Sequence, residues 1–217
     1  MGCTSAQEKD CYDWEKPAHE VTVSSFYIGK YEVTQKEWVA IMDNNPSHFR
    51  PLQFFIPRGN DFPVERVCWA DVQEFITKLN AITGKKFRLL TEAEWEYAAR
   101  GGNRSKNYKY SGSDHIDEVA WYSENSDATT HAVGTKQPNE LGIYDMTGNV
   151  WEWCNDWYGI YTEEAQTNPQ GPTKGSYRIV RGGGWNNDAE NHRIFHRNID
   201  YQGSLFNGLG FRIALSY

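Results

Sequence analysis

The first part of the chain carries the apolar patterns of a short strand followed by a helix. Apolar residues between Val21 and Ile28 alternate and cluster as they do in a β-strand. Thr34 and Glu37 then form a capping box, in which each side chain can satisfy a backbone amide that the start of a helix leaves without a partner. The helix that this box opens is expected to stop at Asn44-Asn45-Pro46, and the prolines of residues 43–62 predict a long surface loop.

Two further helices are predicted by apolar spacing and by a second capping box. Apolar residues recur at i, i+3, i+4 and i+7, as in the buried stripe of a helix, at Val72, Phe75, Ile76, Leu79 and Ile82. Gly84 stands where the C-terminal cap of that helix belongs. The second box runs from Thr91 to Glu94 and opens a short helix that ends at Gly101-Gly102.

The second half of the chain shows no comparable helical pattern. Beyond residue 102, short runs of glycine, aromatic and asparagine residues favour short strands joined by long loops. No linker, repeat or low-complexity tract divides the chain, so we expect a single α+β domain over residues 1–217 with a high loop content. Loops of this length are tolerated only where something pins them or where they carry the function.

Composition narrows the possible functions. The net charge of −7, without any block of Lys or Arg, argues against nucleic-acid binding. No apolar run approaches the roughly 20 residues that span a bilayer, so direct membrane insertion is not expected. The four cysteines form no Cys-x-x-Cys pair, which argues against a zinc site. Cys3 and Cys11 are close enough to close a disulfide loop, as in exported proteins, but free thiols are an equal alternative.

Five segments in a fixed order carry a family resemblance. They are Phe26–Thr34 (FYIGKYEVT), Phe87–Gly102 (FRLLTEAEWEYAARGG), Gly148–Trp153 (GNVWEW), Arg181–Trp185 (RGGGW) and Gly210–Arg212 (GFR). In this order they resemble the formylglycine-generating enzyme family, also called the sulfatase-modifying-factor domain, over nearly the whole chain. The resemblance implies a C-type-lectin-like fold, with two main helices around small twisted antiparallel sheets. The family usually begins with a strand that ends in Met-Gly, so the first strand is expected to be clipped or divergent here.

The resemblance also implies a chemistry for which this chain lacks the ligands. Enzymes of the family oxidise a substrate cysteine with copper held by two thiolates, which lie before the final Gly-Phe-Arg. This sequence has no cysteine between Trp185 and Gly210, and neither asparagine nor histidine replaces a thiolate on Cu(I). Copper is therefore not expected as a cofactor. Iron-dependent relatives hold their iron on a separate helical domain that is missing here. His192 and His196 are four residues apart, but their neighbours favour a loop, and we expect them as polar surface residues.

A structural calcium ion is expected at residues 145–152. Asp145 and Glu152 bracket a glycine-containing turn, and calcium prefers carboxylate and carbonyl oxygens. In an extended chain the carbonyls of Gly148 and Val150 point the same way. The family's calcium site is similar, with ligands at the positions of Asp145, Gly148, Val150 and Glu152. In the alternative, the two carboxylates only make hydrogen bonds in a tryptophan-rich turn.

Residues 186–208 are expected to bind a ligand. They mix aromatic, amide, imidazole and carboxylate side chains without a period of 2 or 3.6, a composition that suits recognition surfaces. The resemblance places this segment on the ligand-facing side of the fold. The residues that we expect to contact the ligand are Asn187, Asp188, His192, Phe195, His196, Asn198, Asp200, Tyr201, Phe206 and Asn207.

The same segment is similar to that of the variable proteins of diversity-generating retroelements, which share this fold. In those proteins, asparagine codons before the terminal strand are altered at their adenines. Nine residues between His196 and Gly208 can arise in this way, whereas Gln202 cannot. A diversified segment and a fixed one both stay open.

The sequence therefore predicts a non-catalytic ligand-binding domain, displayed on a cell or phage surface or secreted. Its partner is expected to be a protein or a glycan on a cell surface. One alternative is a formylglycine-generating or iron-dependent oxidoreductase with a rebuilt active site. Another is a structural module of a larger surface protein.

Overall fold

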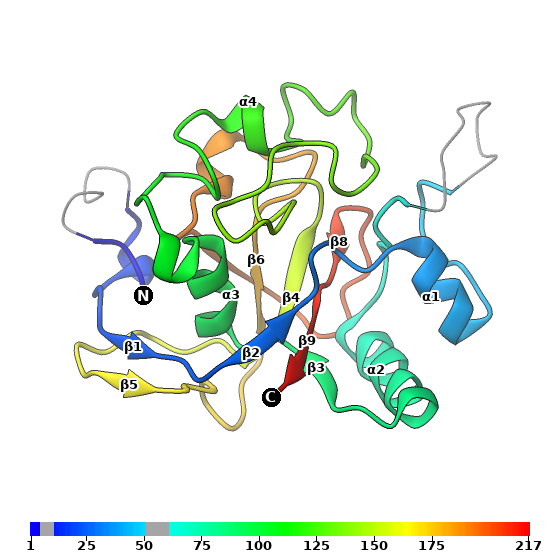
Figure 1. Ribbon diagram of the computed structural model, residues 1–217, viewed down its shortest axis with the longest axis horizontal. Coiled ribbons are helices and arrows are strands. Elements are labelled where there is room, and N and C mark those ends of the chain that lie inside the picture. Colours follow the sequence, from blue (N-terminus) through cyan, green and yellow to red (C-terminus); the bar gives the residue numbers. More distant parts are fainter. Residues whose placement is uncertain (5–10, 51–60) are drawn as a thin grey trace.

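Three small sheets carry the fold, and they pair segments that lie far apart in the sequence (Figure 1). The computed structural model describes residues 1–4, 11–50 and 61–217. The strands of this part form three sheets, in the orders β1-β5, β2-β9-β3 and β7-β6-β4-β8; their bounds are β1 Val21–Thr22, β2 Phe26–Ile28, β3 Phe87–Leu89, β4 Trp151–Trp157, β5 Gln166–Thr167, β6 Arg178–Arg181, β7 Arg197–Asp200, β8 Leu209–Gly210 and β9 Ile213–Ser216.

Strand direction differs in part from the expected antiparallel sheets. The pairs β2·β9, β3·β9, β4·β6 and β6·β7 are antiparallel as expected. The pairs β1·β5 and β4·β8 are parallel, so the expectation is wrong for them. Parallel neighbours need a long crossover connection, and here long stretches of chain separate the two members of each pair. The alternation of side chains along a strand does not encode the direction of its neighbour, which is why the sequence could not reveal this.

The predicted helices are present, and the two with capping boxes begin at these caps. They are α1 (Gln35–Met42), α2 (Trp69–Thr83) and α3 (Glu92–Ala99). In α1 the Glu37 amide donates to the Thr34 hydroxyl at 3.3 Å and the Thr34 amide donates to the Glu37 carboxylate at 2.8 Å. The second capping box makes the same reciprocal pair of bonds at 2.9 and 3.2 Å. Gly84 caps α2 in the left-handed conformation, with φ 68°.

Three details of the helices differ from the expectation. Helix α1 stops at Asp43, which adopts the left-handed conformation (φ 58°) before the Asn-Asn-Pro run is reached. Ile82 is 69% exposed, so it lies outside the buried stripe of α2. A short helix that the sequence did not predict, α4 (Ile116–Val119), follows α3. Of the long loop expected at residues 43–62, positions 51–60 lie outside the described residues.

Aromatic and aliphatic side chains form two core clusters around the four-stranded sheet β7-β6-β4-β8, the central sheet of the fold. One lies between α1, α2 and β4, where the rings of Trp38 and Phe75 stack at 5.3 Å with planes 4° apart. The other lies under α3 and includes Trp95, Met146 and Ile179. Within the described residues no helix has both the length and the apolar character needed to cross a membrane.

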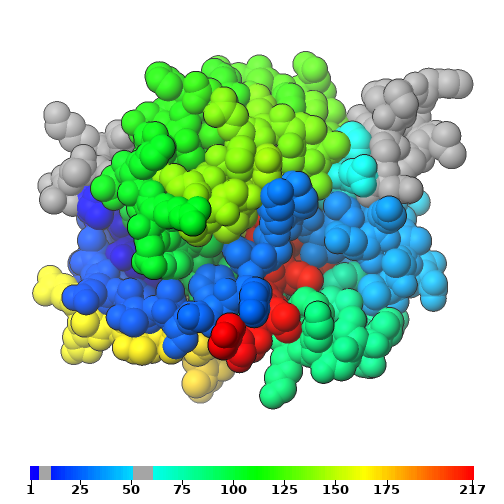
Figure 2. Space-filling model, viewed as in Figure 1, coloured from blue at the N-terminus to red at the C-terminus, as the bar shows by residue number. Residues whose placement is uncertain are grey.

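The long connection between α3 and β4 covers one end of the molecule, as the green segment in Figures 1 and 2 shows. It has little regular structure, and buried side chains pin it. The Asn139 amide donates to the Ala98 carbonyl at 2.8 Å, while its oxygen accepts the backbone amides of Leu141 and Ile143. The irregular half of the chain is thus held by specific side-chain hydrogen bonds.

Buried charges join α3 to the central sheet. Arg181 of β6 is fully buried and donates to the Glu96 carboxylate at 2.6 Å. Arg197 of β7 grips Glu92 with two bonds of 2.9 and 2.6 Å. Burial alone would raise the pKa of Glu96, but Arg100 and Arg181 outweigh burial and lower that pKa to about 2. Both carboxylates face arginine, so α3 is locked to β6 and β7 by matched charges.

Replacing Arg181 by Met should destabilise the protein by about 3–5 kcal/mol, because the change removes a buried guanidinium that contacts both Glu92 and Glu96 and leaves each carboxylate with a single arginine partner. The measurement is urea unfolding at pH 7. Lys78→Met is the matched control: the Lys78–Glu74 pair of α2 is exposed, and its loss should change the free energy of unfolding by less than about 1 kcal/mol. Equal effects of the two changes would contradict a structural role for the buried pair.

Candidate ligand-binding site

The middle of the expected binding segment, residues 192–197, is buried. His192, Phe195 and His196 are 1%, 1% and 5% exposed, so the expectation that the histidines are surface residues is wrong. His192 closes a turn of 3-10 helix, η4 (Ala189–His192), and its ring lies against Gly183, where a Cβ atom would be 2.5 Å away. Burial lowers the pKa of His192 to about 4, which leaves the ring neutral. His192 and Phe195 are therefore not accessible to a ligand in this structure.

Asn187 and Asp188 precede this buried stretch. The Asn187 side-chain oxygen accepts the indole N–H of Trp151 at 2.8 Å and the backbone amide of Gly184 at 3.2 Å, so Asn187 holds the glycine-rich turn in place. Asp188 is exposed and accepts the Ser123 hydroxyl at 3.3 Å. Asp188 is thus exposed, whereas Asn187 is half-buried and uses its side-chain oxygen within the fold.

The later residues of the segment face separate neighbours. Tyr201 is 59% exposed, and its hydroxyl lies 2.8 Å from that of Tyr177. The Asp200 carboxylate accepts the Ser204 hydroxyl. Phe206 packs against the core, and the Asn207 carbonyl accepts the indole N–H of Trp185 at 2.8 Å. The ten expected residues therefore do not form one continuous surface.

A cavity of about 490 Å³ lies where residues 191–199 of this segment meet the N-terminal part of the chain. Its floor and walls come from the 3-10 helix η2 (Asp13–Glu15), from β7 and from the residues beside them. We call it the η2–β7 cavity; its lining residues are Tyr12, Trp14, Tyr158, Asn191, His196, Arg197, Asn198 and Ile199. Of the residues that the sequence suggested, this cavity brings together His196 and Asn198.

Sequence reasoning missed the aromatic residues of this cavity. The rings of Tyr12 and Trp14 stack at 4.6 Å with planes 12° apart, and Trp14 is 46% exposed. Tyr158, the residue directly after β4, also lines the cavity. The sequence offered only the pair Tyr12 and Trp14 close to Cys11 as a signal, because aromatic residues are enriched at recognition surfaces.

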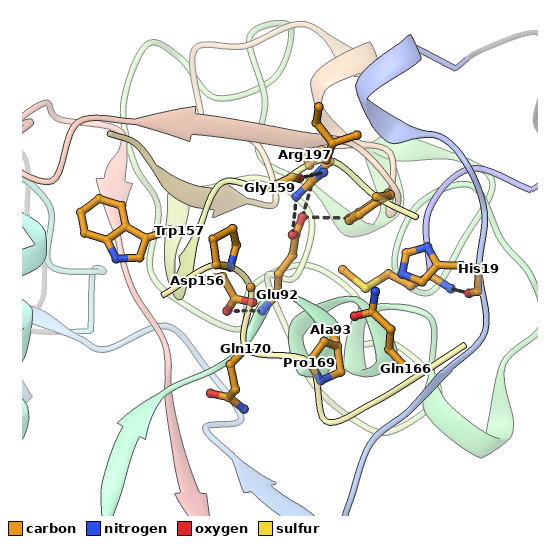
Figure 3. A pocket seen from close by; sticks show the side chains of 15 residues that line it. His19, Glu92, Ala93, Asp156, Trp157, Gly159, Gln166, Pro169, Gln170 and Arg197 are labelled. Carbon is orange, nitrogen blue, oxygen red and sulfur yellow. Dashed lines mark hydrogen bonds and ion pairs between the residues drawn. The ribbon is translucent and has the colours of Figure 1, made fainter. Parts of the chain in front are cut away.

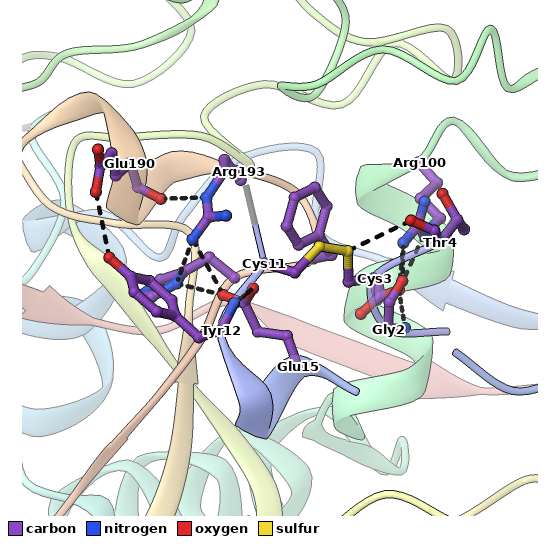
Figure 4. Close-up of a disulfide and its surroundings, with 12 residues drawn as sticks. Gly2, Cys3, Thr4, Cys11, Tyr12, Glu15, Arg100, Glu190 and Arg193 are labelled. Atoms are coloured by element: carbon purple, nitrogen blue, oxygen red, sulfur yellow. Dashed lines mark hydrogen bonds and ion pairs between the residues drawn. A yellow bond between two sulfur atoms is a disulfide. The ribbon is translucent and has the colours of Figure 1, made fainter. Parts of the chain in front are cut away.

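A buried glutamate ties the N-terminal part to β7, as Figure 4 shows for Glu15 and Arg193. The Glu15 carboxylate, 0% exposed, accepts the Nδ1 of His196 at 2.7 Å, Arg193 at 3.3 Å and the Tyr12 backbone amide at 2.9 Å. Burial, together with the charges of Arg193 and Arg181, lowers the pKa of His196 despite the Glu15 carboxylate, so the imidazole is neutral near pH 7 and donates its Nδ1–H to Glu15. One carboxylate thus anchors η2.

The N-terminal part is also closed by a disulfide. Cys3 and Cys11 are bonded, which decides between the two alternatives that the sequence left open. Cys154 is buried and Cys68 half-buried, and burial raises the pKa of both thiols, that of Cys154 well above its usual range. Neither of these two free cysteines is therefore poised as a thiolate for a copper ion.

A second cavity, of about 300 Å³, lies at the start of α3 (Figure 3). Asp156 accepts the Glu92 backbone amide at 2.9 Å, and the Glu92 side chain is held by Arg197 and by the Tyr161 hydroxyl at 3.0 Å. Burial and the nearby Glu92 carboxylate raise the pKa of Asp156 to about 7. Glu92 and Arg197 already pair with each other, and Asp156 holds the start of α3, so these groups stabilise the fold.

The residues expected to bind calcium fit that role in part. The Glu152 carboxylate accepts Arg212 at 2.7 Å and the Trp95 indole at 2.8 Å, so both of its oxygens are already engaged. Asp145 is left-handed (φ 57°) and accepts the Gly134 amide through one oxygen. Burial raises the pKa of Asp145 to about 6, and the Glu152 carboxylate adds to this effect.

A third buried acid, Glu32, lies in the same region. Burial raises its pKa well above the usual range, and the charges of Asp145 and Glu152 raise it further. In the described part of the chain, no group of three or more His, Cys, Asp or Glu side chains is arranged to hold a metal. A calcium ion would have to use the carbonyls of Gly148 and Val150 besides Asp145, and would offset the repulsion among these acids. Calcium stays a prediction.

The fold and the pairing of Glu152 with the final Gly-Phe-Arg motif define the class of the protein: an α+β domain of the formylglycine-generating-enzyme type, with C-type-lectin-like architecture. All of residues 1–217 match the model of the sulfatase-modifying factor enzyme 1-like domain, and the chain belongs to that family.

Three relatives show the range of the family. The structure of Treponema denticola variable protein 1 superposes with a TM-score of 0.88 at 33% identity, over 100% of this chain and 91% of that one. The chaperone protein LppX of Paenibacillus barcinonensis is 37% identical over 241 aligned residues, covering 88% of this chain and 78% of that protein. The formylglycine-generating enzyme of Streptomyces coelicolor is 34% identical over 170 residues, 70% of this chain and 52% of the enzyme.

Stability should fall as the pH rises from about 4 to 7, in part because of Asp156. Its pKa is higher in the folded protein than in the unfolded chain. Within this window the folded state therefore binds more protons than the unfolded chain, and the free energy of unfolding falls as the pH rises. Asp156→Asn keeps an acceptor for the Glu92 amide and removes this ionisation. The variant should gain stability relative to the parent by up to about 1.4 kcal/mol per pH unit, measured by urea unfolding across this range. A difference that stays constant with pH would refute the assignment.

Calcium should stabilise the fold through Asp145. A ligand that binds only the native state raises stability by about 2.7 kcal/mol at a hundredfold excess over its Kd, so chelation should lower the melting temperature. Asp145→Asn should abolish this response. Glu152→Ala is unsuitable, because it also leaves Arg212 buried without its counter-charge. An identical melting temperature with and without chelator would show that calcium does not stabilise this fold.

Proposed function

We propose that this chain is a non-catalytic ligand-binding domain whose site is the η2–β7 cavity. The observation that carries the proposal is the exposed Trp14 side chain, which stacks on Tyr12 and lines a partly open cavity. Concave sites with aromatic walls and a few polar groups are the usual form of a ligand pocket, with volumes of about 300–1,000 Å³. The site is built on rigid support, because Glu15 fixes η2 and Arg197 fixes β7.

The chemistry of the cysteines supports a non-catalytic role. The segment that carries the copper thiolates in the enzymes of the family holds no cysteine here, and the two free thiols have raised pKa values. A formylglycine-generating or iron-dependent oxidoreductase is the rival proposal. Its support is the similarity to the Streptomyces coelicolor enzyme, of which this chain spans about half.

The partner that we propose is a protein or glycan on a cell surface, met by a domain that is itself displayed or secreted. The Cys3–Cys11 disulfide supports an oxidising environment. The similarity to a variable protein of Treponema denticola supports a segment that differs among copies. Three of the residues that line the cavity, His196, Asn198 and Ile199, are among those that altered asparagine codons can produce.

The test is a binding screen against panels of glycans, peptides and small charged ligands, read by calorimetry. The parent should bind at least one class saturably, and Trp14→Ala should weaken that binding about tenfold or more, because aromatic anchors carry most of the energy of an interface. Tyr27→Ala is the control, since Tyr27 is 58% exposed on β2 and lies outside the cavity lining. Both variants should keep the parent's melting temperature within a few degrees.

Two results would contradict the proposal. One is binding that Trp14→Ala and Tyr27→Ala weaken equally, which would place the site elsewhere. The other is formylglycine formed on a Cys-x-Pro-x-Arg peptide in an amount that depends on this protein, with copper supplied and mass spectrometry as the readout. That result would establish the rival oxidoreductase.

A further inference from the structure

The groups that the η2–β7 cavity offers to a ligand are neutral. The Arg197 guanidinium donates to Glu92 and to the Gly159 carbonyl, each at 2.9 Å, and the Arg197 side chain is 2% exposed. The neutral imidazole of His196 is held by Glu15. The two ionisable side chains most able to attract an opposite charge are thus already paired inside the protein. A charged ligand would lose its hydration in this cavity without gaining a free counter-charge.

The aromatic face open to a ligand belongs to Trp14. Tyr12 is in contact with Trp14, with the Arg193 guanidinium 5.0 Å from its ring centre, and with the edge of His196 at 5.8 Å. Its hydroxyl donates to Glu190 at 3.2 Å. Trp14 stacks on this supported ring and leaves nearly half of its own surface in water. The indole is therefore a rigid, flat, apolar platform.

Two amide side chains stand beside the platform. Asn198 is exposed; its oxygen accepts the Ile199 amide at 2.9 Å, and its NH₂ group makes no hydrogen bond within the described ranges of the chain. Asn191 is half-buried, and its NH₂ group makes only a long bond of 3.4 Å to the Asp188 carbonyl. A carboxamide both donates and accepts, so it matches hydroxyl groups, which do the same.

We infer that the η2–β7 cavity binds a neutral carbohydrate, with one sugar ring stacked on Trp14 and its hydroxyls bonded to Asn191 and Asn198. A pyranose ring presents C–H groups on one face and hydroxyls around its edge, which fits an aromatic platform rimmed by amides. The inference rests on the proposed binding function and adds the chemical class of the ligand. The cavity volume of about 490 Å³ lies within the usual range of ligand pockets.

The test compares sugars of the same ring shape that differ in charge. Methyl glycosides of glucose, galactose, mannose and N-acetylglucosamine are the neutral probes, and glucuronic acid and glucosamine are their anionic and cationic counterparts. Saturation-transfer NMR and calorimetry on the whole chain should show binding of at least one neutral probe. The anionic and cationic counterparts should bind about tenfold more weakly or not at all. Equal binding of neutral and charged rings would overturn the inference.

Variants then locate the contacts. Trp14→Ala should weaken binding of the neutral probe about tenfold or more, while Trp14→Phe, which keeps a flat ring, should retain part of it. Asn198→Asp should weaken the neutral probe and strengthen glucosamine, because it places a free carboxylate beside the platform. Tyr27→Ala should leave every affinity unchanged. Should Trp14→Ala fail to fold, Trp14→Phe and Asn198→Asp still decide the question.

The outcomes separate this inference from the proposed function. A peptide or charged ligand that binds in a Trp14-dependent manner, with no response from any neutral sugar, refutes the carbohydrate and leaves the binding domain standing. Sugar binding that Trp14→Ala does not weaken refutes the platform. No Trp14-dependent binding of any class refutes both proposals.

Discussion

The pairing of buried charges between α3 and the strands β6 and β7 is the constraint on which the rest of the structure depends. Each of these ions would cost several kcal/mol to bury alone, so every carboxylate must meet a guanidinium in a defined geometry. Glu96 also accepts the Gly2 backbone amide at 2.8 Å. This bond attaches the disulfide-closed N-terminal part to the same helix. Both β7 and the N-terminal part contact α3, so the same helix holds the two walls of the η2–β7 cavity in place. The placement of the cavity therefore follows from the charge pairing.

Local signals in the sequence predicted local structure well. Both capping boxes and the glycine after α2 act within a few residues, so their effect could be worked out without knowledge of the fold. The parallel pairs β1·β5 and β4·β8 could not be, because strand direction depends on which distant segment arrives as a neighbour. The class of the fold was correct, since the family motifs include the residues that meet across it, such as Glu152 and Arg212.

The binding segment was located correctly only in part, and the reason is physical. Polar composition was taken to mean exposure, but His196 is polar and buried because Glu15, which lies far away in the sequence, supplies its partner. The same contact holds η2, with Tyr12 and Trp14, at the cavity. The two missed residues and the misplaced His196 therefore have one cause. An isolated sequence pattern carries no sign of such a partner. The buried acids around Glu32 show the same limitation, because their mutual repulsion exists only once the chain has folded.

The position of β9 has a consequence for the way in which the protein reaches its fold. Residues 213–216 pair with β2 on one side and with β3 on the other, so in that sheet neither strand has a hydrogen-bonded neighbour until β9 arrives. During synthesis, the apolar residues of β2 and β3 leave the ribosome long before their shared partner is made. Contacts that are so distant in sequence close slowly, and unpaired strand edges invite aggregation while they wait. The nascent domain has to be kept apart from other chains until its last strand is released.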